Sequence, residues 1–215
     1  MPFGFLRRGK EQATERQAPP PGKPDHGRRV PFDGLSEEWR LVGFMNIDGR
    51  LSDALNRREP IEISDMRWAP LDGTGELVEA PGLRTIDPYD LIVVLAGETS
   101  LPPLSDDERT AFKVHKIEYD VALEVPPFRV LGTIFLYPGS EPERLLDRAT
   151  EMFIPVTDAQ ALLGDRQLND PAIDTILVNR FYLRGVSQID KRTGTRVRPL
   201  PGQPLGGTTW TDRAR

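Results

Sequence analysis

The sequence predicts a mainly β protein in which two tandem small β-barrel units, each with a short helical insert, are flanked by flexible tails. Three observations lead to this prediction. Apolar and polar residues alternate at period two in several segments, as in half-buried strands, and Gly, Pro and Asp cluster between these segments. Only two short segments have helical spacing. The order of these elements is nearly the same in both halves of the chain, which indicates an internal repeat.

The two ends of the chain are expected to be disordered. Residues 1–31 form an N-terminal segment with a Pro-rich linker, which has five prolines between Pro19 and Pro31. Residues 199–215 form a tail rich in Gly, Pro and Thr. Residues 1–31 carry a net charge of +4 and residues 191–215 one of +5, whereas residues 32–190 carry −14. Basic ends of this kind are typical of tails that seek an anionic surface, or of tails that neutralise their own acidic body.

The first barrel unit is expected in residues 32–111. Alternation predicts strands in Trp39–Ile47 and Pro60–Trp68, with a helical insert at Arg50–Arg58 between them. The continuous apolar run "DLIVVLAG", Asp90–Gly97, is typical of a strand buried on both faces.

The second unit is expected in residues 112–198 and repeats these features. The sequence pairs Gly43 with Gly132, Asp65 with Asp158 and Asp90 with Asp174, and a second helical insert is expected at Glu141–Thr150. A glycine in the middle of a strand often marks a sharp bend, so each sheet is expected to curl tightly. The residues expected in the two cores are Leu41, Met45, Ile47, Ile61, Ile63, Ile92, Val130, Ile134, Leu136, Ile154, Val156 and Ile176.

Composition narrows the function classes. The chain has no cysteine, so it can hold no disulfide, thiolate nucleophile or cysteine metal site. It has no apolar run of membrane-spanning length and no apolar stretch of signal-peptide length near its start, and it is therefore expected in the cytoplasm. His26 falls in the linker and His115 on the polar face of a strand, and no metalloprotease, phosphate-loop or dinucleotide motif is present. We expect no enzyme, cofactor or metal site.

The first ten residues offer the one candidate docking element. Three large apolar residues are followed by three cations, an order suited to weak, reversible contact with an anionic membrane at its inner face. The alternatives are docking in a groove of a partner protein and a frayed terminus without a role. The residues concerned are Phe3, Phe5, Leu6, Arg7, Arg8 and Lys10.

Two resemblances are carried by short motifs. "GRLSDALN", Gly49–Asn56, followed by a strand ending in Ser-Asp, and "FIPVTDA", Phe153–Ala159, resemble a bacterial domain family of unknown function with an RLSD-x-LN/LTDA signature, here present twice. That resemblance implies no activity or ligand. The order Gly43, Asp53, Asn56, Asp65 and the segment Phe181–Ile189 are similar to Sm-like barrels, which implies SH3/Sm-like β-barrel units and RNA binding.

These observations favour a non-catalytic binding or assembly module with a protein partner. Exposed strand edges can recruit a further strand, and nothing catalytic is needed for this. The alternatives are an Sm-like RNA-binding protein and an enzyme whose groups meet only in space. The net charge of −14 on residues 32–190 argues against nucleic-acid binding, because phosphate groups are bound by cations. Near the first motif only Arg57 and Arg58 form a basic pair. The oligomeric state is left open.

Overall fold

The computed structural model of this 215-residue chain describes residues 27–97, 100, 116–147, 151–190, 192–193 and 195–197. In the first half the elements are β1 (Arg28–Leu35), β2 (Trp39–Ile47), α1 (Leu51–Asn56), β3 (Ile61–Glu62), β4 (Ser64–Pro70), β5 (Val78–Glu79), β6 (Thr85–Ile86), the 3₁₀ helix η1 (Pro88–Asp90) and β7 (Val93–Ala96). In the second half they are β8 (Ile117–Val125), β9 (Phe128–Leu136), the 3₁₀ helix η3 (Pro142–Leu146), β10 (Phe153–Leu163), β11 (Arg166–Gln167), β12 (Thr175–Asn179), the 3₁₀ helix η4 (Arg180–Tyr182) and β13 (Gly185–Gln188).

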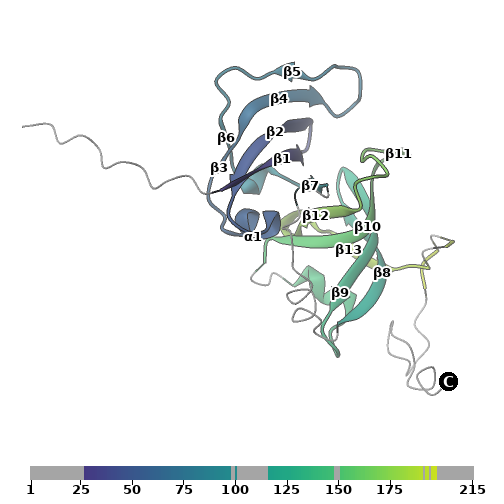
Figure 1. Ribbon diagram of the computed structural model, residues 1–215. Helices are drawn as coiled ribbons and strands as arrows, with labels where there is room; N and C mark the ends of the chain where they lie inside the picture. The colour runs from purple at the N-terminus through teal and green to yellow at the C-terminus, as the bar shows by residue number, and fades with distance from the viewer. Residues whose placement is uncertain are drawn as a thin grey trace, which may run out of the picture.

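The predicted mainly β fold is confirmed, and its pairings are antiparallel (Figure 1). One large sheet runs in the order β13-β8-β9-β10-β12-β7-β1-β2-β4-β5, with β11 beside β10, and β3 and β6 form a separate pair. This sheet is continuous across both halves and does not close into a barrel, so the two tandem barrels that the sequence predicts are not confirmed.

The two halves share the register of their first three strands. In the hairpin β1–β2 Phe32 lies opposite Gly43, and in the hairpin β8–β9 Val121 lies opposite Gly132. The third strand pairs with the second through a register shift in both halves, at Val42/Phe44 of β2 and at Thr157/Gln160 of β10. The two glycines therefore occupy the same place in the same pattern of strands.

Both glycines permit a close crossing of strands, as their mid-strand position predicted. A Cβ on Gly43 would lie 2.5 Å from Ile63 Cγ2, and one on Gly132 would lie 2.7 Å from Val156 Cγ1. Distances this short exclude any side chain at either position, because carbon atoms in contact are separated by about 3.5–4.0 Å. The strong bend of the sheet at this point thus depends on glycine in both halves.

Asp65 and Asp158 occupy the register shifts rather than the ends of strands. Both have left-handed backbone conformations, with φ of 53° and 47°. Asp tolerates this region better than most residues. The carboxylate of Asp65 accepts a hydrogen bond from Arg29 Nη2 at 2.5 Å.

One predicted pairing of the repeat is wrong. β7 pairs with β1, where Val94 lies opposite Gly34, and β13 pairs with β8, where Val186 lies opposite Leu123. β7 therefore corresponds to β13, and β6 corresponds to β12, so Asp90 does not match Asp174. In the sequence β7 resembles β12, because both are continuous apolar runs that follow an aspartate, and this likeness led to the wrong pairing.

Two predicted boundaries also differ. β1 begins at Arg28, inside the range 1–31 that was expected to be a linker, because its backbone pairs with β2 as far as Ile47. The second helical insert is the 3₁₀ helix Pro142–Leu146, whereas the first is an α-helix, Leu51–Asn56.

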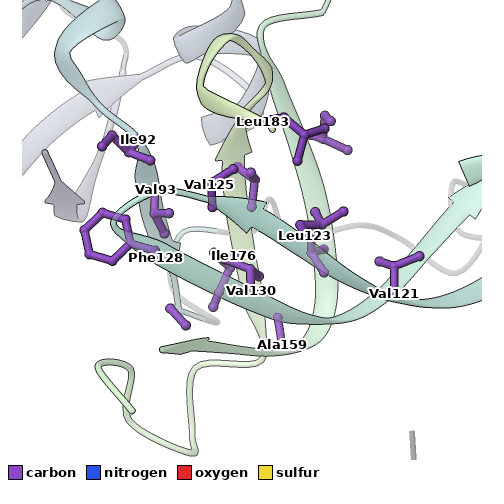
Figure 2. Close-up of a cluster of buried hydrophobic side chains, with 14 of the residues drawn as sticks. Ile92, Val93, Val121, Leu123, Val125, Phe128, Val130, Ala159, Ile176 and Leu183 are labelled. Carbon is purple, nitrogen blue, oxygen red and sulfur yellow. The ribbon is translucent and has the colours of Figure 1, made fainter. Parts of the chain in front are cut away.

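The core predictions are confirmed with one exception. Of the twelve residues expected inside, all are buried except Leu136, which is half-buried. They fall into two clusters, one in each half, but the clusters exchange residues. Ile92 and Val93 of the first half pack with Val121, Leu123 and their neighbours in the second (Figure 2). Each core is therefore completed by the other half.

Ile63→Ala is expected to lower the free energy of unfolding by about 2–5 kcal/mol, because Ile63 is 4% exposed in the first cluster. Chemical denaturation measures this change. Val78→Ala is the control, because Val78 is 53% exposed and should cost less than about 0.5 kcal/mol. Equal effects of the two substitutions would contradict the placement of Ile63.

Candidate functional site

A groove of about 1220 Å³ opens on the first half of the protein. It lies along β3, the start of β4 and the segment Glu79–Thr85 that leads into β6. Ile61, Ile63 and Met66 line it and belong to the first hydrophobic cluster. The groove thus has a floor of apolar side chains that are themselves buried in the core, and a rim open to solvent.

The rim of the groove carries charges of both signs. Its charged lining residues are Arg57, Arg67, Arg84, Glu59, Glu62, Asp65 and Glu79. Charges of both signs are interspersed along the rim, so it presents no surface of a single sign.

One wall of the groove is organised around Phe44, which is 37% exposed. The Arg29 guanidinium lies 4.1 Å from the centre of the Phe44 ring while its Nη2 donates to the carboxylate of Asp65. Both charged side chains are more than half exposed, so the pair contributes little to stability. The pair has a local effect: it holds the Arg29 guanidinium over the ring of Phe44, next to the register shift at Asp65.

The strand β6 adjoins the groove and has an open edge. Within the residues that the structure describes, β6 pairs with β3 alone. The N–H of Ile63 donates to the carbonyl oxygen of Arg84 at 2.8 Å, which directs the backbone of Arg84 toward β3. Because bonding alternates along an antiparallel strand, the N–H and C=O of Thr85 point to the opposite, open side.

The side chains along this edge are exposed. Arg84, Thr85 and Asp87 are exposed, and Leu83 is 40% exposed, whereas Ile86 faces the core. Asp87 also accepts a hydrogen bond from the N–H of Tyr89 at 2.9 Å, which caps the 3₁₀ helix η1. The edge is therefore an ordered strand end with backbone groups available for pairing.

The corresponding edge in the second half is covered. All five residues of β12, Thr175–Asn179, are buried, and β12 pairs with β7 of the first half. Leu177 lies opposite Val94 and Ile176 lies opposite Leu95. β12 is therefore the covered counterpart of the β6 edge.

Polar side chains hold this junction between the halves together. Asn179 Nδ2 donates to the carbonyl oxygen of Leu91 at 2.7 Å. Asn56 Oδ1 accepts from the N–H groups of Met152 and Phe153, both at 2.8 Å. These bonds satisfy polar groups at the junction that burial would otherwise leave unpaired.

Two further side chains cross the junction near its rim. Arg166 donates to the carbonyl oxygens of Leu71 and Asp72. Tyr182 Oη donates to the carbonyl oxygen of Tyr89 at 2.9 Å. Burial raises the pKa of Tyr182, and nearby carboxylates, Asp90 first, raise it further, so its hydroxyl keeps the proton that it donates.

Three of the other shifted pKa values in the described part of the chain belong to structural contacts, and burial lowers the pKa of the fourth group, Arg180. The hydrogen bond from Arg40 to Asp33, at 2.6 Å, raises the pKa of Arg40. Desolvation raises the pKa of Tyr119, and the N–H of Thr74 lowers the pKa of Asp72. The described residues also contain no group of three or more His, Asp or Glu side chains that could hold a metal ion.

The structure does not test the docking element that the sequence predicts. Phe3, Phe5, Leu6, Arg7, Arg8 and Lys10 lie outside the described residues, as do His26 and His115. Of the basic pair, Arg57 lines the groove and the Arg58 guanidinium lies 5.8 Å from the centre of the Phe181 ring.

Sequence reasoning missed the groove and the β6 edge. Gly, Pro and Asp cluster in the segment Pro70–Gly82, which favours turns, and β6, with two residues, is too short to show an alternating pattern.

No protein family, curated protein or solved structure matches this chain. None of the helices in its described part has the length and apolar character needed to cross a bilayer.

Proposed function

We propose that this chain is a non-catalytic binding module, built from two copies of one small, strongly bent β unit of SH3/Sm-like type, which takes up an extended segment of a partner protein along β6. The observation that carries this proposal is the contrast between two corresponding strands. β12 is covered by β7 over its whole length, while β6 lies open beside the groove.

Several features support the two-copy reading. The first hairpins share one register, the register shifts fall at Asp65 and Asp158, and β7 and β13 pair with the first strand of their own halves. A 3₁₀ helix precedes β7 and β13 alike. In such a unit the strand before the last, β6 or β12, lies at an edge of the sheet. An exposed edge of this kind is covered by another element, protected from pairing by its side chains, or paired with a further strand.

Addition of a strand explains why the edge and the groove occur together. An extended peptide beside β6 would bond its backbone to Thr85, and alternate side chains would point into the groove, where Ile61 and Ile63 lie. Main-chain bonds give such a complex its affinity, and side-chain positions give it specificity.

A peptide that copies Leu91–Ala96, the segment that covers β12, is expected to bind the full-length chain saturably. Fluorescence anisotropy of the labelled peptide measures the binding, and hydrogen exchange should show new protection of the Thr85 amide. The reason is that this amide faces the open side of β6.

Thr85→Pro is the decisive variant, because proline removes that N–H, and edge positions tolerate proline. Thr85→Ser keeps the N–H and is the matched control. Binding that Thr85→Pro leaves unchanged would refute strand addition at β6.

A further inference from the structure

We infer that the segment bound at β6 is an antiparallel strand of a partner protein in which a cation and a carboxylate flank two apolar residues, in the order basic, apolar, apolar, acidic. This inference rests on the proposed function, since it specifies the chemistry of the peptide that the same edge takes. It follows from the register in which β7 pairs with β12, because each residue of β6 has a counterpart in β12.

The transfer is fixed by pairings within each half. Ile86 lies opposite Ile61, and Val178 lies opposite Ile154. Asp87 and Asn179 both follow these residues, and both accept a hydrogen bond from the N–H two residues ahead, at 2.9 and 3.0 Å. Arg84 of the open edge therefore stands where Ile176 stands in the covered edge, and Asp87 stands where Asn179 stands.

The junction then identifies what faces each charge. Ile176 lies opposite Leu95 of β7, and the N–H of Asn179 donates to the carbonyl oxygen of Ile92 at 2.9 Å. A peptide placed like β7 thus brings the position of Leu95 beside Arg84 and the position of Ile92 beside Asp87. Opposite charges in directly facing positions stabilise an antiparallel pair, and like charges destabilise it.

Between these two positions β7 itself is apolar. Val93 and Val94 of β7 lie opposite Val178 and Leu177, whose counterparts on the open edge are Ile86 and Thr85. β-Branched side chains suit such positions on a half-buried strand. The acidic residue of the peptide would extend to the part of the groove that Arg84 lines.

A second copy of this chain satisfies the requirement only in part. β13 corresponds to β7, because Gly185 lies opposite Glu124 as Val93 lies opposite Leu35. If β13 of the second copy bound at β6 of the first, its Arg184 would lie beside Asp87, but its Ser187 would lie beside Arg84. Its outer edge is also engaged, since the carbonyl oxygen of Gln188 accepts from the N–H of Val197 at 2.9 Å. The edge therefore favours a partner protein.

The test uses the full-length chain and labelled six-residue peptides based on Leu91–Ala96. The matched peptide has lysine in place of Ile92 and glutamate in place of Leu95, and the reversed peptide has these two residues exchanged. Fluorescence anisotropy is expected to show the matched peptide binding about ten-fold tighter, with the difference shrinking at high salt.

Two variants of the chain assign the charges. Arg84→Glu should reverse the preference between peptides that differ only at the position of Leu95. Asp87→Asn, which keeps the oxygen that caps η1, should abolish the preference between peptides that differ only at the position of Ile92. Circular dichroism of both variants checks that the fold is intact.

Equal binding of the matched and reversed peptides would overturn the inference and leave the proposed function standing, whereas failure of every peptide to bind would overturn both. Sedimentation of the chain alone provides the third outcome. Self-association that Arg184→Glu abolishes would make a second copy the occupant of the edge and would also overturn the inference.

Discussion

Phe153→Ala is expected to lower the free energy of unfolding by about 3–5 kcal/mol. Phe153 is completely buried, and although β10 belongs to the second half, its side chain packs in the cluster of the first half with Val30 and Phe32. Its backbone N–H also donates to Asn56 Oδ1. A substitution in β10 of the second half should therefore weaken the core of the first half.

Chemical denaturation followed by tryptophan fluorescence measures this effect, because Trp39 and Trp68 both lie in the first half, where their rings stack at 4.5 Å between centres. A change in the second half should thus shift the part of the fluorescence that comes from these two rings, to which Trp210 in the tail adds its own contribution. Phe135→Ala is the matched control, because Phe135 is 42% exposed. A tryptophan transition that Phe153→Ala leaves in place would show that the halves unfold independently.

Asn179→Asp is expected to lower the free energy of unfolding by about 3 kcal/mol at pH 7. Asn179 is completely buried and donates to the carbonyl oxygen of Leu91. A carboxylate there would lose that bond and place an uncompensated charge opposite an oxygen. Burial would raise the pKa of the new carboxyl, so the loss should diminish as the pH falls and the protonated group can donate again.

The reverse change at the corresponding position is the control. Asp87→Asn alters an exposed residue that needs only its oxygen for the cap of η1, and it should change stability by less than about 0.5 kcal/mol. Denaturation midpoints measured at several pH values compare the two variants. Similar losses in both, or a loss in Asn179→Asp that does not depend on pH, would contradict the role assigned to Asn179.

Local patterns in the sequence were sufficient for most of the strands and the core. The alternation in Trp39–Ile47 identified β2, because side chains of a strand point to opposite faces in turn. The glycines at 43 and 132 identified the bends, because only glycine permits the observed approach of strands. β1 was missed although Val30 and Phe32 alternate, because Pro31 and the nearby prolines suggested a linker.

Contacts between distant parts of the chain decided the remainder. β7 and β12 are both apolar runs, and no local pattern shows that they pair with each other rather than form the same strand of two separate barrels. The pairing is decided by contacts between residues near 94 and residues near 177, which are far apart in the sequence. The site depends on the same fact. Thr85 of β6 and Leu177 of β12 hold corresponding places in the two halves. β7 pairs with β12 and buries the edge at Leu177. No further strand in the described part of the chain pairs with β6, so the edge at Thr85 stays open.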